Sequence, residues 1–386
     1  MDKVVIVMAA WNEAENIKRM IETLFNDVFP KINADMHLLI ADNNSTDGMT
    51  QIVEEEMKKR KNLHIVEQGD KKGLGNAYVV GFKYAIDKLG ADAVMEMDAD
   101  GQHPPEFVKP MVDAYLNGGD YVIGSRYIPG GSVPKEWAFF RKAISFFGNL
   151  FIRIVLLKPK LHDLTTGFRL TRVKGVLDKI DLDNLMERER FAYKVDLLYQ
   201  SIKNAKKVVE VPLAFKPRIT DKSKFNTKEM ISTFKVAIIL GIKDKARFIK
   251  FATVGFIGYL VNASTLFLFT KLAFPGIAAW GLSTELAIIS NFTWNNIWTF
   301  KTEKISGIKM IATKFLQFNL TSLGALAIQT VFGSLSDLLF GIQYRQLALP
   351  FIILFLVLPY NYFMYNAVIW KTWKLPWSKK LKTQNA

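Results

Sequence analysis

The pattern of apolar and polar residues changes near residue 240 of this 386-residue chain. Before that point, short apolar runs alternate with longer segments of mixed polarity, which is typical of strands alternating with helices. The strands are predicted at 4–8, 38–42, 63–68, 93–98 and 121–125, and the helices at about 13–26, 46–60, 74–89 and from 105 onward. Because the connections are short, the fold class is α/β, with a mostly parallel, Rossmann-like sheet that carries helices on both faces.

The second part of the chain contains four long runs without charge, at 251–270, 286–300, 315–336 and 346–370. About 20 apolar residues cross the hydrocarbon core as a helix, so four transmembrane helices are predicted. The second helix must start near Ile277 to be long enough, which places Glu285 in or near the membrane. Lysine and arginine gather before the first helix, between the second and third, and after the fourth. By the positive-inside rule, the α/β part and both termini lie on the cytoplasmic side of the cell membrane.

Two further segments, 137–157 and 228–243, are apolar but interrupted by basic residues, as in helices that lie in the membrane interface. Packed core helices are the alternative for both. We therefore predict an α/β catalytic domain at 1–227, which includes the first interfacial helix, a second interfacial helix and linker at 228–246, and a four-helix membrane domain at 247–386.

Composition narrows the possible chemistry. The chain has no cysteine, which excludes disulfides, a thiol nucleophile and every cysteine-ligated metal site. It has 51 Lys and Arg against 36 Asp and Glu, a net charge of +15. Such a surplus favours an anionic partner, either nucleic acid or a membrane surface. Because much of it flanks the predicted spans, nucleic acid is disfavoured.

Polar residues gather where the predicted strands end, which is where open α/β sheets bind ligands. The segments that follow four of the strands are 9–13, 42–48, 98–102 and 124–127. Taken singly, such segments can be no more than helix caps and tight turns, and 42–48 fits that description as well as it fits a site.

The pair Asp98 and Asp100 is more specific. Alternate residues of a strand share a face, so the two carboxylates can converge at the strand end. Two like charges this close favour a divalent cation, and Gln102 offers a third oxygen. Magnesium or manganese in such a site takes further oxygens from water and phosphate, which predicts a substrate with a diphosphate. A chance pair of surface aspartates is the alternative.

Several basic residues follow the strand ends. Arg126, Arg169, Arg218 and Lys224 have Gly, Thr or Pro nearby, and this turn-like context favours phosphate binding. Lys142 and Arg153 fit a solvated basic face instead.

With these residues identified, the chain resembles the dolichol-phosphate mannose synthase group of the family 2 glycosyltransferases, which have the GT-A fold. The resemblance covers about residues 3–224 and rests on several motifs, and the part after 247 resembles the GtrA-type membrane domain. The motifs are Trp11-Asn12-Glu13, Asp42 to Gly48, Lys72 to Gly75, Asp98 to Asp100 with His103-Pro104-Pro105, Gly124 to Tyr127, Asp163 to Arg169, Glu210 to Pro212, Arg218 and Ser223-Lys224. The chain departs from the family pattern at Ala9, Trp11, Asn43 and Asp221.

The resemblance implies roles for particular residues. The base and ribose of the nucleotide sugar would contact Ala9, Trp11, Glu13, Ile40 and Asp42. Asp98, Ala99 and Asp100 would meet the ribose and diphosphate, and the metal would be held by Asp100 and Gln102 together with Asp98. Phosphates would be held by Arg126, Arg218 and Lys224, and Asp98, Asp100 and Arg126 are the expected catalytic residues.

The resemblance also implies the reaction, which is inverting transfer of mannose from GDP-mannose to dolichyl or another polyprenyl phosphate for protein or lipid glycosylation. A phosphomonoester is already an anion at neutral pH, so it needs no strong general base. Arg141 and Ser145 lie one helical turn apart in the first interfacial helix. We expect them to bind the lipid phosphate together with Arg126.

Three alternatives remain open at this point. The chain could be a polyprenyl-phosphate glucosyltransferase that uses UDP-glucose. It could be a processive polysaccharide synthase, although it lacks the Gln-x-x-Arg-Trp motif of those enzymes. It could also be a lipid-sugar flippase or scaffold with an inactive transferase domain, although the intact Asp98 and Asp100 argue against that. The sequence makes no prediction of an oligomeric state.

Overall fold

The computed structural model describes residues 1–69, 73–217, 227–341 and 344–373. The chain forms two compact units, Met1–Gly241 and Ile242–Ala386, which are treated separately below.

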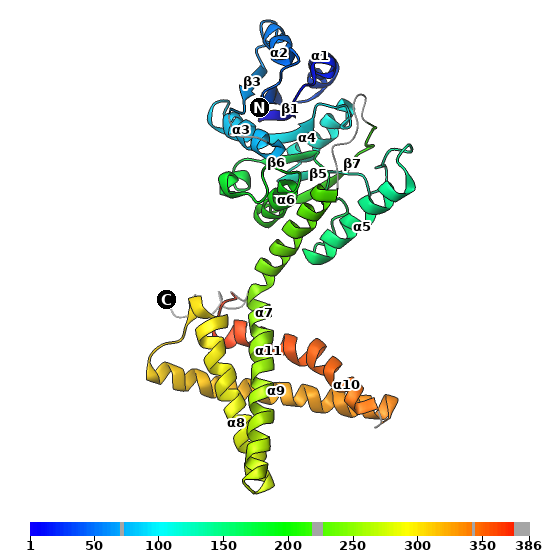
Figure 1. Ribbon diagram of the computed structural model, residues 1–386. Coiled ribbons are helices and arrows are strands. Elements are labelled where there is room, and N and C mark those ends of the chain that lie inside the picture. The colour runs from blue at the N-terminus through cyan, green and yellow to red at the C-terminus, as the bar shows by residue number, and fades with distance from the viewer. Residues whose placement is uncertain (70–72, 218–226, 342–343, 374–386) are drawn as a thin grey trace. The chain divides into compact units, whose positions relative to one another are not determined.

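The first unit is built on a seven-stranded sheet with the order β3-β2-β1-β4-β6-β5-β7 (Figure 1). Neighbouring strands are parallel except for β6, which runs antiparallel to both β4 and β5. The strands are β1 (Lys3–Ala10), β2 (Asp35–Asp42), β3 (Leu63–Glu67), β4 (Ala93–Asp98), β5 (Tyr121–Ser125), β6 (Arg169–Arg172) and β7 (Val208–Pro212). The predicted mostly parallel sheet is therefore confirmed.

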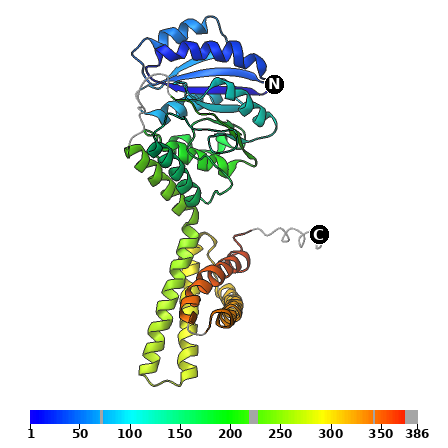
Figure 2. The same ribbon diagram turned by 90° about the vertical axis from the view of Figure 1, so that its right-hand side faces the viewer.

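Helices cover both faces of this sheet, because successive side chains of its apolar strands point to opposite sides (Figure 2). In β1, Ile6 packs in the core on the side of α1, α2 and α4, whereas Val7 packs in the core with α3 and α6. The helices are α1 (Ala14–Thr23), α2 (Met49–Met57), α3 (Leu74–Asp87), α4 (Val108–Leu116), α5 (Phe139–Val155) and α6 (Tyr193–Asn204).

The sequence pattern missed two strands, β6 and β7. The four residues of β6 have an arginine at each end, and such a segment lacks the apolar run by which the other strands are identified. Arg169 was expected in a turn that favours phosphate binding, but it lies in this strand and is fully buried. Its guanidinium Nη1 donates to the Lys194 carbonyl at 2.6 Å, so its charge is used inside the fold.

The segment predicted as the first interfacial helix is helix α5. One side of α5 packs through Ile152 against the start of α7, at Val236 and Leu240. The other side exposes large apolar side chains, with Phe139 87% and Phe147 63% exposed. A soluble core helix would bury these rings, so the packed-core alternative is not met, and the interfacial location stays a prediction.

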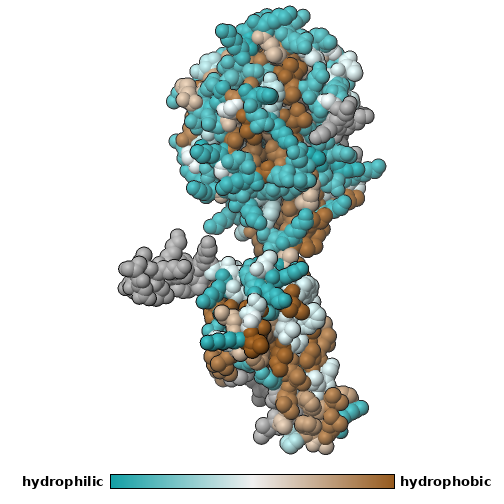
Figure 3. All heavy atoms as spheres, turned by 90° about the vertical axis from the view of Figure 1, so that its left-hand side faces the viewer, coloured by the Kyte–Doolittle hydropathy of each residue, from teal (hydrophilic) through white to brown (hydrophobic). Residues whose placement is uncertain are grey.

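The second unit is helical and contains most of α7 (Thr227–Lys271), α8 (Gly276–Trp294), α9 (Ile308–Phe340), α10 (Arg345–Ile352) and α11 (Leu358–Met364). Its core is rich in aromatic residues, and the rings of Phe300 and Trp370 stack at 4.3 Å. Within the described residues, two helices are long and apolar enough to cross a membrane, Thr227–Phe269 and Pro350–Ile369. Figure 3 shows apolar side chains over much of the visible surface of this unit. The count of four spans stays a prediction.

Candidate active site

A cavity of about 720 Å³ lies at the carboxyl ends of β1, β4 and β5. It brings together predicted residues from four parts of the chain. These are Ala9, Trp11 and Glu13 at or just after the end of β1, Asp98, Ala99, Asp100 and Gln102 at or just after the end of β4, Arg126 after β5, and Arg141 and Ser145 on α5. Two other predicted residues do not line it. Ile40 is fully buried in the core, and Asp42 is 2% exposed beneath the loop that follows β2.

The loops after β1 and β2 are joined by side-chain hydrogen bonds. The Asp42 carboxylate accepts bonds from the Ser45 hydroxyl at 2.6 Å and the Thr50 hydroxyl at 2.9 Å. Ser45 in turn accepts the backbone N–H of Asn12 at 2.9 Å. In this structure the Asp42 side chain stabilises the turn, which agrees with the interpretation of segment 42–48 as a tight turn. The turn also holds the backbone at Asn12, next to Trp11, which is 47% exposed.

At the end of β4, the two aspartates have different surroundings. The Tyr78 hydroxyl donates to Asp98 Oδ1 at 2.9 Å, and the ammonium of Lys194 lies 3.5 Å from the same oxygen. Asp100 is 4% exposed, and its Oδ1 accepts the backbone N–H of Gln102 at 3.0 Å. Asp98 is therefore paired with a cation of the protein, and both aspartates line the cavity together with Gln102.

His103 supports this turn from beneath. Its Nδ1 accepts the backbone N–H of Asp98 at 2.9 Å, so the ring proton of the neutral histidine is on Nε2. Burial lowers the pKa of His103 to about 4, and the nearby Asp98 only partly opposes this shift. The ring is therefore neutral at physiological pH and serves as a hydrogen-bond acceptor.

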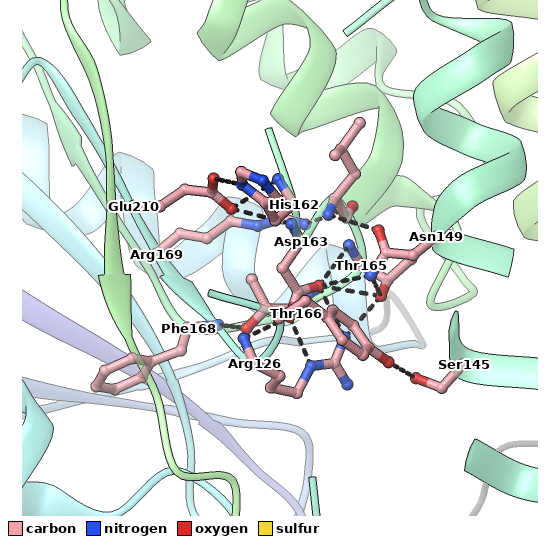
Figure 4. Close-up of polar contacts among 12 residues, drawn as sticks. Arg126, Ser145, Asn149, His162, Asp163, Thr165, Thr166, Phe168, Arg169 and Glu210 are labelled. Carbon is pink, nitrogen blue, oxygen red and sulfur yellow. Dashed lines mark hydrogen bonds and ion pairs between the residues drawn. The ribbon is translucent and has the colours of Figure 1, made fainter. Parts of the chain in front are cut away.

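Arg126 is held by the buried carboxylate of Asp163, the residue on which several bonds converge in Figure 4. Its Nε donates to Asp163 Oδ2 at 2.6 Å and its Nη2 donates to Asp163 Oδ1 at 2.8 Å. Burial by itself would raise the pKa of Asp163, but Arg126 and the hydrogen bonds lower it to about 2. The guanidinium is thus oriented at the edge of the cavity by a carboxylate that stays ionised.

Helix α5 and the segment before it contribute further polar groups to the cavity. The Arg141 guanidinium carbon lies 3.9 Å from the centre of the Trp137 ring, which is cation–π distance. Ser145 shares a hydrogen bond of 2.6 Å with the Tyr127 hydroxyl. Asn149 binds Asp163 Oδ1 at 3.0 Å and so ties α5 to the ion pair of Arg126. Arg126, Arg141 and Ser145 consequently line one cavity, whereas Arg218 and Lys224 lie outside the described residues.

Comparison with known proteins gives two family matches. Residues 5–178 match the glycosyl transferase family 2 model, and residues 250–370 match the GtrA/DPMS transmembrane domain model. The chain is 31% identical to the dolichol-phosphate mannosyltransferase of Pyrococcus furiosus over 85% of this chain and 89% of that protein. The chain is a family 2 glycosyltransferase with a GtrA/DPMS transmembrane domain.

Two bacterial relatives support the same assignment. The transferase is 35% identical to the polyprenol monophosphomannose synthase of Mycolicibacterium smegmatis over 64% of this chain and 90% of that protein. It is 34% identical to the undecaprenyl-phosphate mannosyltransferase of Micrococcus luteus over 58% of this chain and 88% of that protein. These matches confirm both the resemblance and the enzyme class that the motifs predict.

The donor atoms of the transferase fit a hard divalent cation. The Asp100 carboxylate and the Gln102 amide both offer oxygen, as magnesium and manganese prefer. Among the described residues, no group of three or more His, Cys, Asp or Glu side chains could hold a metal by itself. A metal bound here would therefore take most of its ligands from water and from the phosphates of a substrate.

Several residues of the site were not identified from the sequence. Asp163 and His103 belong to recognised motifs, but the sequence does not predict that Asp163 pairs with Arg126 or that His103 accepts the Asp98 backbone N–H. Asn149 and Lys194 lie in helices, at positions where polar residues are usually solvated, although both are buried here. Only the folded chain shows their contacts, because each partner is distant in sequence.

Replacing Asp163 by Asn should destabilise the first unit by about 3–5 kcal/mol, because it leaves the buried Arg126 without its ionic partner. The free energy of unfolding can be measured by chemical denaturation in detergent. Asp113→Asn is the matched control, since it breaks only a surface pair with Lys109 and should cost about 0.5 kcal/mol or less.

The difference in the free energy of unfolding between the Asp163→Asn variant and the natural chain should become smaller as the pH falls from about 4 toward about 2. The folded-state pKa of Asp163 is below its unfolded value, so its contribution is complete above the unfolded pKa and is lost as the pH falls through the folded one. Equal stability of the two Asp→Asn variants at neutral pH would show that the ion pair is dispensable.

Proposed function

We propose that the chain transfers mannose from GDP-mannose to dolichyl or another polyprenyl phosphate, with inversion at the anomeric carbon, and releases GDP. The observation that carries this proposal is a single cavity lined both by the Asp98–Asp100 motif and by the two arginines Arg126 and Arg141. The names of the three relatives, all mannosyltransferases or mannose synthases with polyprenol-type acceptors, support the same donor sugar and acceptor class.

The nucleotide sugar would bind between the β1 and β4 ends. The exposed ring of Trp11 offers a surface on which a base can stack, and Glu13 and Asp98 offer acceptors for ribose hydroxyls. Ile40 and Asp42 do not line this cavity, so we assign them only to the support of the loops. Asp100 and Gln102 would hold a magnesium or manganese ion, which when bound stabilises the charge of the diphosphate.

The acceptor would bind along α5. Its phosphate fits between Arg126 and Arg141, with the Ser145 hydroxyl beside them. The adjoining part of the cavity is apolar and lies between α5 and the first turns of α7, where it is lined by Phe140, Ile144, Ile152, Met230 and Phe234. A prenyl chain attached to the phosphate is matched to such a lining, and the exposed rings of α5 would rest in the membrane interface.

The chemistry needs little from a general base. The second pKa of a phosphomonoester is about 6, so the acceptor oxygen is already a nucleophile at neutral pH. It would attack the anomeric carbon from the face opposite the diphosphate, forming the new C–O bond while the old C–O bond breaks and its electrons leave with GDP. Arg126 and Arg141 would reduce the repulsion between the two phosphates. His103 is buried and neutral, and its role is to hold the Asp98 backbone.

We further propose that the membrane domain crosses the bilayer four times and that the catalytic unit faces the cytoplasm. Support comes from the match to the transmembrane domain model and from the placement of basic residues between the apolar runs.

Purified enzyme should transfer mannose from GDP-mannose to dolichyl phosphate and should leave UDP-glucose largely unused. A panel of nucleotide sugars with radiolabelled sugar and extraction of the lipid product measures this directly. Preferential use of UDP-glucose would replace the proposal by the glucosyltransferase alternative, which shares the same motifs.

Replacing Asp100 by Ala should abolish sugar transfer, because it removes the carboxylate that is proposed to hold the metal. Nucleotide binding, followed by quenching of tryptophan fluorescence, should remain detectable because the β1 loop is intact. Asp113→Ala, an exposed position on α4, is the control and should transfer sugar normally. Full transfer by the Asp100 variant would remove this residue from the mechanism.

Replacing Arg141 by Ala should raise the KM for the lipid acceptor by about tenfold to a hundredfold, as expected for a lost charge-assisted contact to phosphate. The KM for the nucleotide sugar should change little. Lys142→Ala is the matched control, since Lys142 donates to the Lys135 carbonyl at 2.9 Å and does not line the cavity. An equal rise in both KM values for the Arg141 variant would contradict the assignment.

A further inference from the structure

Lys194 is fully buried beneath the Asp98–Asp100 turn, although lysine is among the residues least often buried. It lies in the first turn of α6, and its Nζ is 3.5 Å from Asp98 Oδ1. Among the described residues this nitrogen has no hydrogen-bond partner. Its surroundings include the rings of Phe191 at 4.8 Å and Tyr78 at 5.4 Å, and the buried carboxylate of Glu96.

Lys194 has charged neighbours on β4 and β6. Glu96 lies two residues before Asp98 on the same face of β4, and Arg169 of β6 stands opposite Glu96 in the strand register. Arg169 also binds the Lys194 carbonyl, which holds the start of α6 in place. Arg169 and Lys194 both stabilise the ionised form of the buried Glu96, and Lys194 is in addition within ion-pair distance of Asp98.

Burying the Lys194 ammonium destabilises the fold, so its presence suggests that the charge serves the site. Removing an ammonium from water costs several kcal/mol, and its pairing with Asp98 recovers only part of that when further hydrogen bonds are missing. The fold even leaves room for the ammonium, because a Cβ on Gly167 would lie 2.1 Å from Nζ. An apolar side chain among these aromatic rings would stabilise the core more simply.

We propose that Lys194 is a positioning residue that binds the Asp98 carboxylate and so sets how tightly the motif holds its divalent cation. This inference rests on the metal site of the proposed function. Because Lys194 offsets the charge of Asp98, the motif offers a divalent cation less negative charge than its carboxylates would without this lysine. Asp100 and Gln102 would then hold the cation only weakly, and the diphosphate of the donor would supply further ligands.

The test is the affinity for Mn²⁺ alone, measured on the full-length protein in detergent by the electron paramagnetic resonance signal of free Mn²⁺. Lys194→Met keeps the length of the side chain and removes its charge. It should lower the Kd for Mn²⁺ by about tenfold or more, because Asp98 then adds its charge and oxygens to the site. Lys83→Met removes a surface lysine paired with Asp183 and should leave the Kd unchanged.

A double variant, Asp98→Asn with Lys194→Met, removes both charges of the pair and should return the Kd to within about threefold of the natural chain. A far weaker Kd in the double variant would show that Asp98 is itself a metal ligand and would overturn the inference. So would an unchanged or higher Kd in Lys194→Met. If that single variant does not show a cooperative thermal transition, the double variant still decides, because it leaves no buried unpaired charge.

Asp100→Asn separates failure of this inference from failure of the proposed metal site. Loss of Mn²⁺ binding in that variant supports the site, and the Lys194 result then stands on its own. Retention of the natural Kd by Asp100→Asn would show that the metal site itself is wrongly assigned.

Discussion

The ionised carboxylate of Asp163 is the interaction on which the site of this glycosyltransferase depends. It accepts bonds from the backbone and guanidinium of Arg126, from Asn149 on α5, and from the backbone of its own loop at Thr166. These donors come from the end of β5, the middle of α5 and the start of β6, three segments that share little else. A neutral side chain could satisfy some of them, but only a carboxylate offers enough acceptor sites and the charge that Arg126 requires.

The position of Asp163 in turn depends on Glu210 of β7. Its carboxylate accepts the backbone N–H groups of His162 at 2.9 Å and Asp163 at 3.0 Å, and so anchors the loop to β7. Glu210 therefore supports the residue that supports Arg126, and the Arg126 side of the cavity is anchored to the sheet. Preorganisation of this kind lets a cationic site meet a phosphate without reordering its own side chains.

Much of this architecture can be predicted from the sequence, and the residues that were not identified show where such prediction fails. Five strands and the helices between them follow from alternation of apolar and mixed segments, and Asp98, Asp100 and Arg126 follow from their place at strand ends. Strand β6 escaped because its burial depends on partners from distant parts of the chain, which compensate charges that look solvent-exposed in isolation. Lys194 was not identified for the same reason, since its partner Asp98 is distant in sequence. The resemblance implies that Ile40 contacts the nucleotide, but its side chain is buried in the core and does not line the cavity.

The reversed direction of β6 also bears on how such an enzyme can change over evolutionary time. Because β6 runs against β5, the chain leaves the sheet after Ser125 and returns beside the same point, where Gly124 N–H donates to the Phe168 carbonyl at 2.8 Å. The intervening segment carries α5, which forms part of the cavity wall. Its length can vary at little entropic cost, roughly 0.6 kcal/mol for each doubling, and without shifting the register of any strand. Selection can therefore change the cavity wall that α5 forms while the strand end that carries Asp98 and Asp100 stays unchanged.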